Sequence, residues 1–132
     1  MSENKVSKLT LTDLIKNKEK YEVKPDTTSE IFIERLGASI VVRKPERSLC
    51  LECMEMVNDP ARSDEADIHM VYNTVVEPNL KDPELHKSFE CTEPHDIVGK
   101  IFETGEIANI SGVGMELAGY HSGIKKVEDL KN

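Results

Sequence analysis

The sequence predicts an α+β fold, a small and mostly helical single domain with about five helices and one β-hairpin. Three observations support this class. The chain has 132 residues and 38% hydrophobic composition, which suffices for one compact core but not for two. Two short runs rich in β-branched residues, 31–33 and 40–42, flank a turn that contains Gly37. Elsewhere the apolar residues recur at helical spacing.

We expect the domain to cover residues 9–120, between a flexible N-terminus of residues 1–8 and a polar C-terminal tail of residues 121–132. Both ends are polar and show no apolar period. No internal repeat and no low-complexity segment divides the chain. The sequence therefore indicates one core with two loose ends.

The domain is expected to begin with a short helix and the hairpin. Thr10 or Thr12 can cap the helix, which should end near Tyr21. A stretch that contains Pro25 then serves as a connector. The hairpin follows at about residues 30–43.

From Pro45 onward the apolar period becomes helical. A proline suits the first turn of a helix because its missing N–H would have had no partner there. A polar loop follows this helix, and Ser63 or Asp64 is expected to cap the next one. The apolar stripe of the helix consists of Leu49, Cys50, Cys53, Met54, Met56 and Val57.

The strongest periodic signal belongs to the next helix and follows the i, i+3, i+4, i+7, i+8 pattern. We expect this stripe to be mainly core and the helix to end before Pro78, because proline disfavours helical geometry in the residue ahead of it. The stripe consists of Ile68, Val71, Tyr72, Val75 and Val76.

Three more helices are expected in the C-terminal half. Pro83 and Pro94 each occupy a position where a first helical turn can begin, and Thr104 with Gly105 should end the second of these helices. The last helix should span about residues 106–117 and have Gly119 as its C-terminal cap. Its apolar face contains Ile107, Ile110, Val113, Gly114 and Leu117. Its small residues Ala108, Gly112, Gly114 and Ala118 should let another helix approach closely.

The net charge of -8 is concentrated in the middle of the chain. Residues 55–96 contain eleven acidic and three basic residues, whereas the rest of the chain contains fourteen of each. An acidic surface repels phosphate backbones and opposes the counterion release that drives nucleic-acid binding. We therefore expect a protein partner and no nucleic acid, although the acids could also serve only to keep a small domain in solution.

The sequence predicts a cytoplasmic protein without a membrane partner. No apolar run approaches the length that crosses a bilayer, and the N-terminal residues lack the apolar stretch of a signal peptide. Three cysteines, an odd number without secretory context, fit a reduced compartment.

Cys50 and Cys53 form a C-x-x-C pair, which could be a redox dithiol or, together with Cys91 and His95, a zinc site. The pair lies inside the apolar stripe of a helix, without the βαβ unit of a redox motif, and neither half shows a glycine-bearing zinc knuckle. Two small core side chains are therefore the favoured interpretation. A small zinc-binding or dithiol redox protein is the alternative.

The sequence contains no nucleophile elbow, no P-loop and no G-x-G-x-x-G motif after a strand. We therefore predict no catalytic residue, no cofactor site and no metal site. The stretch VYNTVVEPNLKDPEL, residues 71–85, is partly apolar and lies among acids, which suits holding a peptide better than chemistry. The predicted partner contacts are Tyr72, Val76, Pro78 and Leu80, with Met115 and Tyr120 from the last helix.

Four blocks of the chain carry a resemblance to a known family: RLGASIVVRKPERSLCLECMEM, HMVYNTVVEPNLKDPEL, EPHDIVGKIFETGEIANISGVGMELAGY and IKKVEDLKN. They resemble the tail assembly chaperones of contractile-tailed prophages and phage-tail-like particles of the PBSX (XkdN-like) type. The resemblance covers about residues 9–132, and VYNTVVEPNLKDPEL and GVGMELAGY are its most specific parts. The cysteine and histidine pairs are not part of it.

The resemblance implies a non-enzymatic chaperone that binds the tape measure protein and keeps it soluble, until tube protein polymerises and displaces the chaperone. It implies action in the bacterial cytoplasm and absence from the mature particle. The tail tube protein and a frameshifted longer form of the chain are further implied partners. Lys125 and Lys126 could be encoded by a slippery sequence, although two lysines also fit an ordinary polar tail. A structural tail component is another alternative.

Overall fold

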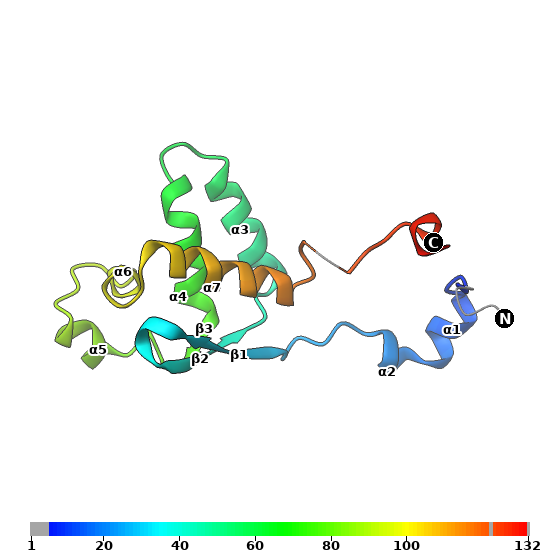
Figure 1. Ribbon diagram of the computed structural model, residues 1–132, viewed down its shortest axis with the longest axis horizontal. Coiled ribbons are helices and arrows are strands. Elements are labelled where there is room, and N and C mark those ends of the chain that lie inside the picture. Colours follow the sequence, from blue (N-terminus) through cyan, green and yellow to red (C-terminus); the bar gives the residue numbers. More distant parts are fainter. Residues whose placement is uncertain (1–5, 122, 132) are drawn as a thin grey trace. The chain divides into compact units, whose positions relative to one another are not determined.

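A computed structural model describes residues 6–121 and 123–131 of the chain. These residues form seven α-helices, three 3-10 helices and three strands (Figure 1). The predicted α+β class is confirmed, with more helices than the sequence indicated. Most of the N-terminus predicted to be flexible, residues 1–5, lies outside the described residues.

The chain divides into two compact units. The main unit is Pro25–His121, and the terminal unit combines Met1–Lys24 with Ser122–Asn132. The boundaries predicted from the sequence, with a domain over residues 9–120, stay a prediction. None of the described helices is both long enough and apolar enough to cross a membrane.

The main unit begins with the predicted hairpin. Strand β1 (Thr28–Ile33) pairs antiparallel with β2 (Ala38–Arg43), and a 3-10 turn, η1 (Glu34–Leu36), connects them. Gly37 closes the turn with a φ of 62°, a left-handed conformation that glycine adopts without steric cost. The prediction of a hairpin around Gly37 is therefore confirmed.

A third strand, β3 (Val75–Glu77), pairs antiparallel with β2, so the sheet has the order β1-β2-β3. The sequence pattern placed Val75 and Val76 in a helix, and this assignment is wrong. Helix α4 (Ala66–Thr74) ends at Thr74, and Val75 takes an extended conformation. β-branched valines fit both states, and pairing with β2 decides between them. The peptide bond between Glu77 and Pro78 is cis.

Helices α3 (Arg47–Val57) and α4 lie side by side, with the 3-10 turn η2 (Ser63–Glu65) ahead of α4 (Figure 1). Pro45 precedes α3 and is not in its first turn, because Glu46 is the N-cap. The predicted caps of α4 are also wrong. Ser63 and Asp64 belong to η2, and the N-cap position of α4 has no side-chain hydrogen bond.

Three helices complete the main unit: α5 (Pro83–Ser88), α6 (Asp96–Ile101) and α7 (Thr104–Leu117). Pro83 occupies the first turn of α5 as predicted, behind an Asp82 cap that accepts from two N–H groups. Pro94 lies ahead of the N-cap of α6. Thr104 and Gly105, predicted to end a helix, begin α7 after the Glu103 N-cap.

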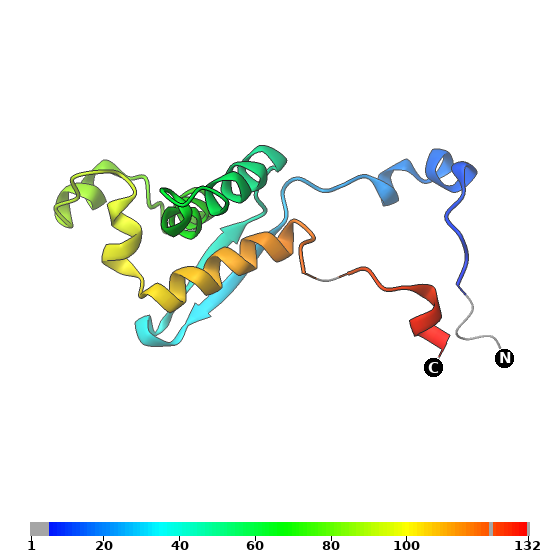
Figure 2. The same cartoon turned by 90° about the horizontal axis from the view of Figure 1, so that it is seen from above.

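The core lies between the sheet and helices α4, α6 and α7 (Figure 2). Its buried residues are Ile33, Ile40, Val42, Val71, Val75, Leu80, Ile97, Val98, Phe102, Ile107 and Ile110. Helices α4 and α7 pack closely at Gly114, where a Cβ would lie 3.5 Å from Sδ of Met70, an ordinary van der Waals distance that would also admit an alanine. The predicted close approach is confirmed at Gly114.

The terminal unit contains two short helices, α1 (Leu11–Lys16) and α2 (Lys18–Tyr21), and the 3-10 helix η3 (Val127–Lys131). Thr10 caps α1 as predicted, since its hydroxyl accepts from the N–H of Asp13 at 3.1 Å. The single predicted helix is broken at Asn17. No residue of α1 or α2 is buried.

Candidate partner-binding surfaces

Tyr72, the first predicted contact residue, is half-buried on α4. Its ring stacks on His95, with ring centroids 4.2 Å apart, and Nζ of Lys81 lies 5.3 Å from the ring centroid. Lys81 also donates to Asn73 Oδ1 at 2.9 Å. His95 and Lys81 therefore cover part of the Tyr72 ring, and a partner could contact only the part of the side chain that stays exposed.

A chain of hydrogen bonds joins Glu52, His69 and His95. Nε2 of His69 lies 2.6 Å from Oε1 of Glu52, and Nδ1 of His69 lies 3.0 Å from Nε2 of His95. A carboxylate only accepts, so His69 donates from Nε2, and in the neutral pair His95 donates to Nδ1 of His69. This chain connects α3, α4 and the start of α6.

The pKa of His95 is lowered from its ordinary value of 6.5, first by burial and then by the positive charge of His69 and Lys81, against a smaller opposing effect of Glu65 and Asp96. The unfolded chain therefore binds this proton more readily than the folded one. The stability that His95 contributes by staying neutral is fully present above pH 6.5. It is lost as the pH falls through the lower pKa that His95 has in the folded state.

We expect the stability of the chain to decline between about pH 7 and pH 5, and His95→Phe to reduce this slope because phenylalanine keeps a ring beside Tyr72 but cannot titrate. Urea unfolding at a series of pH values measures how the free energy of unfolding depends on pH. An unchanged slope in His95→Phe would contradict the expectation.

The residues after Tyr72 divide into exposed and buried ones. Val76 is 41% exposed and Pro78 is exposed, so both can still meet a partner. Leu80 has 0% exposure and belongs to the core. Leu80 was predicted as a partner contact, but its burial leaves none of its side chain open to a partner. The N–H of Lys81 donates to Oδ1 of Asn79 at 3.0 Å, and this turn directs Leu80 inward.

Met115 and Tyr120 lie elsewhere in the main unit. Met115 is half-buried against Leu49, Cys53 and Met70, and the hydroxyl of Tyr120 donates to Sδ of Met54 at 3.5 Å. The predicted contact residues therefore do not form one cluster. They fall into a group around Tyr72 and a group beside α3.

Beside Tyr120, α3 exposes an apolar stripe that the sequence pattern did not predict, which we call the α3 stripe: Leu51, Met54 and Val57. The predicted apolar stripe of this helix included Met54 and Val57, but only its members Leu49, Cys50, Cys53 and Met56 are buried. Leu51 lay outside the predicted stripe. The wide stripe of apolar residues on this helix was the available signal, because one packed face cannot cover all of them.

The terminal unit exposes apolar residues more densely than the main unit. Among the described residues, seventeen large hydrophobic side chains are exposed, and ten of them belong to the terminal unit. Leu11 is 73% and Ile15 70% exposed, and with Leu14 they share one face of α1. The ten are Val6, Leu9, Leu11, Leu14, Ile15, Tyr21, Val23, Ile124, Val127 and Leu130.

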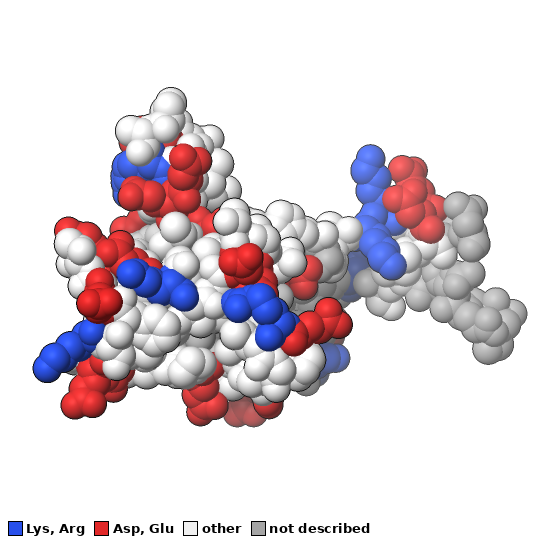
Figure 3. All heavy atoms as spheres, turned by 60° about the vertical axis from the view of Figure 1, so that its left-hand side comes forward, with Lys and Arg blue, Asp and Glu red and all other residues white. Residues whose placement is uncertain are grey.

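The two units also differ in charge. The main unit has nineteen acidic and eight basic residues, whereas the terminal unit has six acidic residues and nine lysines. Carboxylates are spread over the face of the main unit in Figure 3. A hollow of about 660 Å³ in the main unit has Met56 and Ile68 in its lining, and its charged groups are three carboxylates and one amine: Glu65, Glu93, Asp96 and Lys100. Such a surface attracts basic partners.

The cysteines do not support the zinc or redox alternative. Burial raises the pKa of the Cys50 thiol and raises the pKa of Cys53 to about 11, which disfavours the thiolate that binds zinc or attacks a disulfide. Nε2 of His95 already contacts His69. Within residues 6–121 and 123–131, no group of three or more His, Cys, Asp or Glu side chains is placed to hold a metal ion.

Comparison with known proteins gives one family. The sequence model described as "Phage XkdN-like tail assembly chaperone protein, TAC" matches residues 11–131. No curated protein and no solved structure matches the chain. The match extends over both units.

Proposed function

The chain belongs to the XkdN-like phage tail assembly chaperones, and on this premise we propose that it binds the tape measure protein and keeps it soluble during tail morphogenesis. Long amphipathic helices expose apolar stripes that aggregate until they are covered. A chaperone of such a client needs apolar surface of its own, and it needs no catalytic residue.

The observation that carries this proposal is the density of exposed apolar side chains in the terminal unit. Contiguous apolar surface on a protein marks an interaction site, because water disfavours it. Helix α1 has six residues and no buried side chain, so neither its length nor its packing stabilises it. Contact with an apolar stripe on a client would supply the missing burial.

The α3 stripe and Tyr120 form a second apolar surface, in the main unit. Methionine adapts its shape to different partners, which suits Met54 to clients of varied sequence. The acidic residues of the main unit would steer a basic client and discourage self-association. Tyr72, Val76 and Pro78 remain further proposed contacts.

We also propose that the chain acts in the bacterial cytoplasm, that polymerising tube protein displaces it, and that it is absent from the mature particle. A longer frameshifted form would take part in the same exchange. Mass spectrometry of purified particles separates this proposal from a structural tail component, because only a structural component would be present in stoichiometric amounts.

Co-expression with the tape measure protein of the same gene cluster tests the proposal. We expect the tape measure protein to move from the pellet to the soluble fraction, and to copurify with the affinity-tagged chain. A tape measure protein that stays insoluble and does not copurify would overturn the proposal.

A further inference from the structure

Strand β1 is an edge strand whose outer side is open. The N–H of Lys44 donates to the carbonyl of Thr27 at 2.8 Å just before the strand. This bond shows which residues of β1 direct their backbone groups toward β2. Antiparallel pairs alternate, so the backbone groups of Thr28, Glu30 and Phe32 point away from β2. In the part of the chain that the structure describes, these groups have no hydrogen-bond partner.

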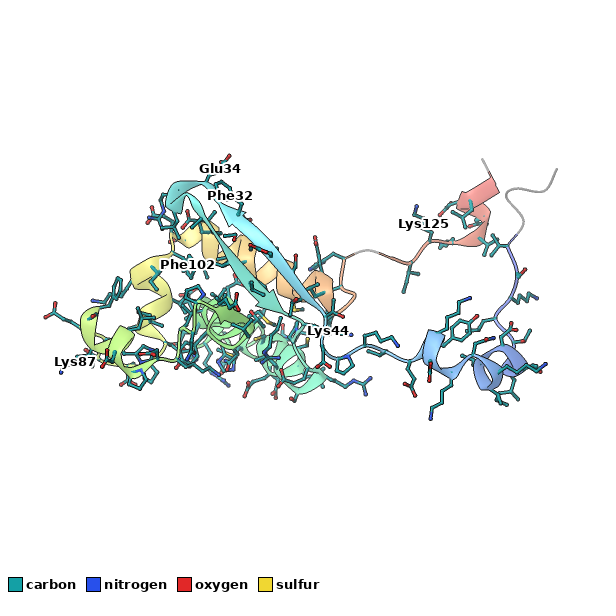
Figure 4. All side chains as sticks on the ribbon, turned by 90° about the horizontal axis from the view of Figure 1, so that it is seen from below. Phe32, Glu34, Lys44, Lys87, Phe102 and Lys125 are labelled. Carbon is teal, nitrogen blue, oxygen red and sulfur yellow. The ribbon has the colours of Figure 1, made fainter. Side chains whose placement is uncertain are left out.

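A groove accompanies this open edge. It has a volume of about 660 Å³ and runs between β1 and α7, with Ile31 and Ile33 on the strand side and Ile110 and Val113 on the helix side. In Figure 4, Phe32 and Glu34 lie where β1, the edge strand of the sheet, ends in the hairpin turn. The groove therefore places the unpaired backbone groups of Phe32 beside apolar walls, and Glu34, Arg35, Glu106 and Asn109 complete its lining.

One end of the groove is fixed by an ion pair. Nη2 of Arg35 lies 3.0 Å from Oε1 of Glu106 and donates to the carbonyl of Ile101 at 2.6 Å. This bonding lowers the pKa of Glu106, so its carboxylate is retained. The ion pair joins the hairpin turn to α7 and holds the two walls of the groove at a fixed separation.

We propose that the open edge of β1 binds an extended segment of a partner protein, which adds to the sheet as a fourth strand in the groove beside α7. Backbone groups of the segment would pair with Thr28, Glu30 and Phe32, and alternate apolar side chains would enter the groove. The carboxylates of Glu30 and Glu34 favour a lysine or arginine on the solvent-facing side of the segment. None of these residues belongs to the apolar surfaces proposed for the tape measure protein.

A second copy of the chain is a poorer occupant. Antiparallel pairing of two β1 strands about their common centre would place Glu30 opposite Glu30 of the second copy, and like charges directly opposite one another are destabilising. A basic, apolar segment places opposite charges there instead. Phe32, 65% exposed on the other face of β1, could contact the outward side chains of such a segment.

Glu30→Pro tests the proposal, because proline removes the outward N–H and is tolerated on edge strands. The matched control is Glu30→Thr, which removes the same carboxylate but keeps the N–H. The probe is a short acetylated peptide in which valine and lysine alternate, and binding is followed by NMR shifts of backbone amides in the full chain. We expect shifts centred on Thr28, Glu30 and Phe32, and at least about tenfold weaker binding in Glu30→Pro than in Glu30→Thr.

A second measurement avoids any effect of proline on folding. A peptide that is N-methylated on alternate backbone nitrogens should lose binding to the wild-type chain when the methylated edge faces β1. Equal binding of the methylated and unmethylated peptides, or shifts outside β1 and α7, would overturn the proposal. A dimer that forms without peptide and is lost in Glu30→Pro would show that the second copy is the occupant instead.

Discussion

Leu80→Ala is expected to lower the free energy of unfolding by about 2–5 kcal/mol, the usual cost of truncating a fully buried leucine. Leu80 has 0% exposure and lies in the core with Val71, Val75 and Ile97. Alanine would leave a cavity there, because the turn around it is fixed. The Asp82 cap holds one side of this turn, and Nε2 of His86 lies 2.6 Å from the carbonyl of Leu80.

The matched control is Leu51→Ala, the same change on the α3 stripe. Leu51 is 54% exposed, so its truncation should change the free energy of unfolding by no more than about 0.5 kcal/mol. Urea unfolding of both variants, followed by circular dichroism, measures the difference. Equal effects of the two substitutions would contradict the placement of Leu80 in the core.

Leu11→Glu combined with Ile15→Glu is expected to weaken binding of the tape measure protein by more than about tenfold. Burying each of these side chains against a client would contribute roughly 1.5–3 kcal/mol, and a tenfold change in affinity corresponds to about 1.4 kcal/mol. The variant should leave folding of the main unit unchanged, since neither residue is buried. Pull-down of the client at a series of chain concentrations measures the affinity.

Lys16→Gln combined with Lys20→Gln is the control for charge. It alters the net charge by the same amount within the same unit but leaves the apolar face of α1 intact. We expect a much smaller loss of binding. If both double variants lose binding equally, the charge of the terminal unit and not its apolar face would carry the interaction.

The sequence was sufficient for those parts of the fold that local chemistry determines. Gly37 marks the hairpin turn because the left-handed conformation there suits glycine, and Pro83 marks the start of α5. The sequence was insufficient where contact with a segment far away in the chain decides the local conformation. Val75 and Val76 continue a helical apolar period, and only pairing with β2 draws them into a strand.

The candidate site was less predictable than the fold, because exposure depends on what covers each side chain. Leu80 stands between polar turn residues and gives no periodic signal, yet it is buried. Leu11 and Ile15 form an ordinary amphipathic pattern, and nothing in the pattern indicates that the structure leaves their face uncovered. Met54 and Tyr120 are far apart in the sequence, so their contact follows from the tertiary structure alone.

The most direct measurement of the proposed chaperone activity is light scattering during dilution of urea-unfolded tape measure protein into buffer, with and without the chain. Equimolar wild-type chain should suppress the scattering, and the Leu11→Glu, Ile15→Glu variant should suppress it far less. Scattering that is unchanged by the wild-type chain, relative to an equal concentration of an unrelated acidic protein, would contradict the assignment of the tape measure protein as its client.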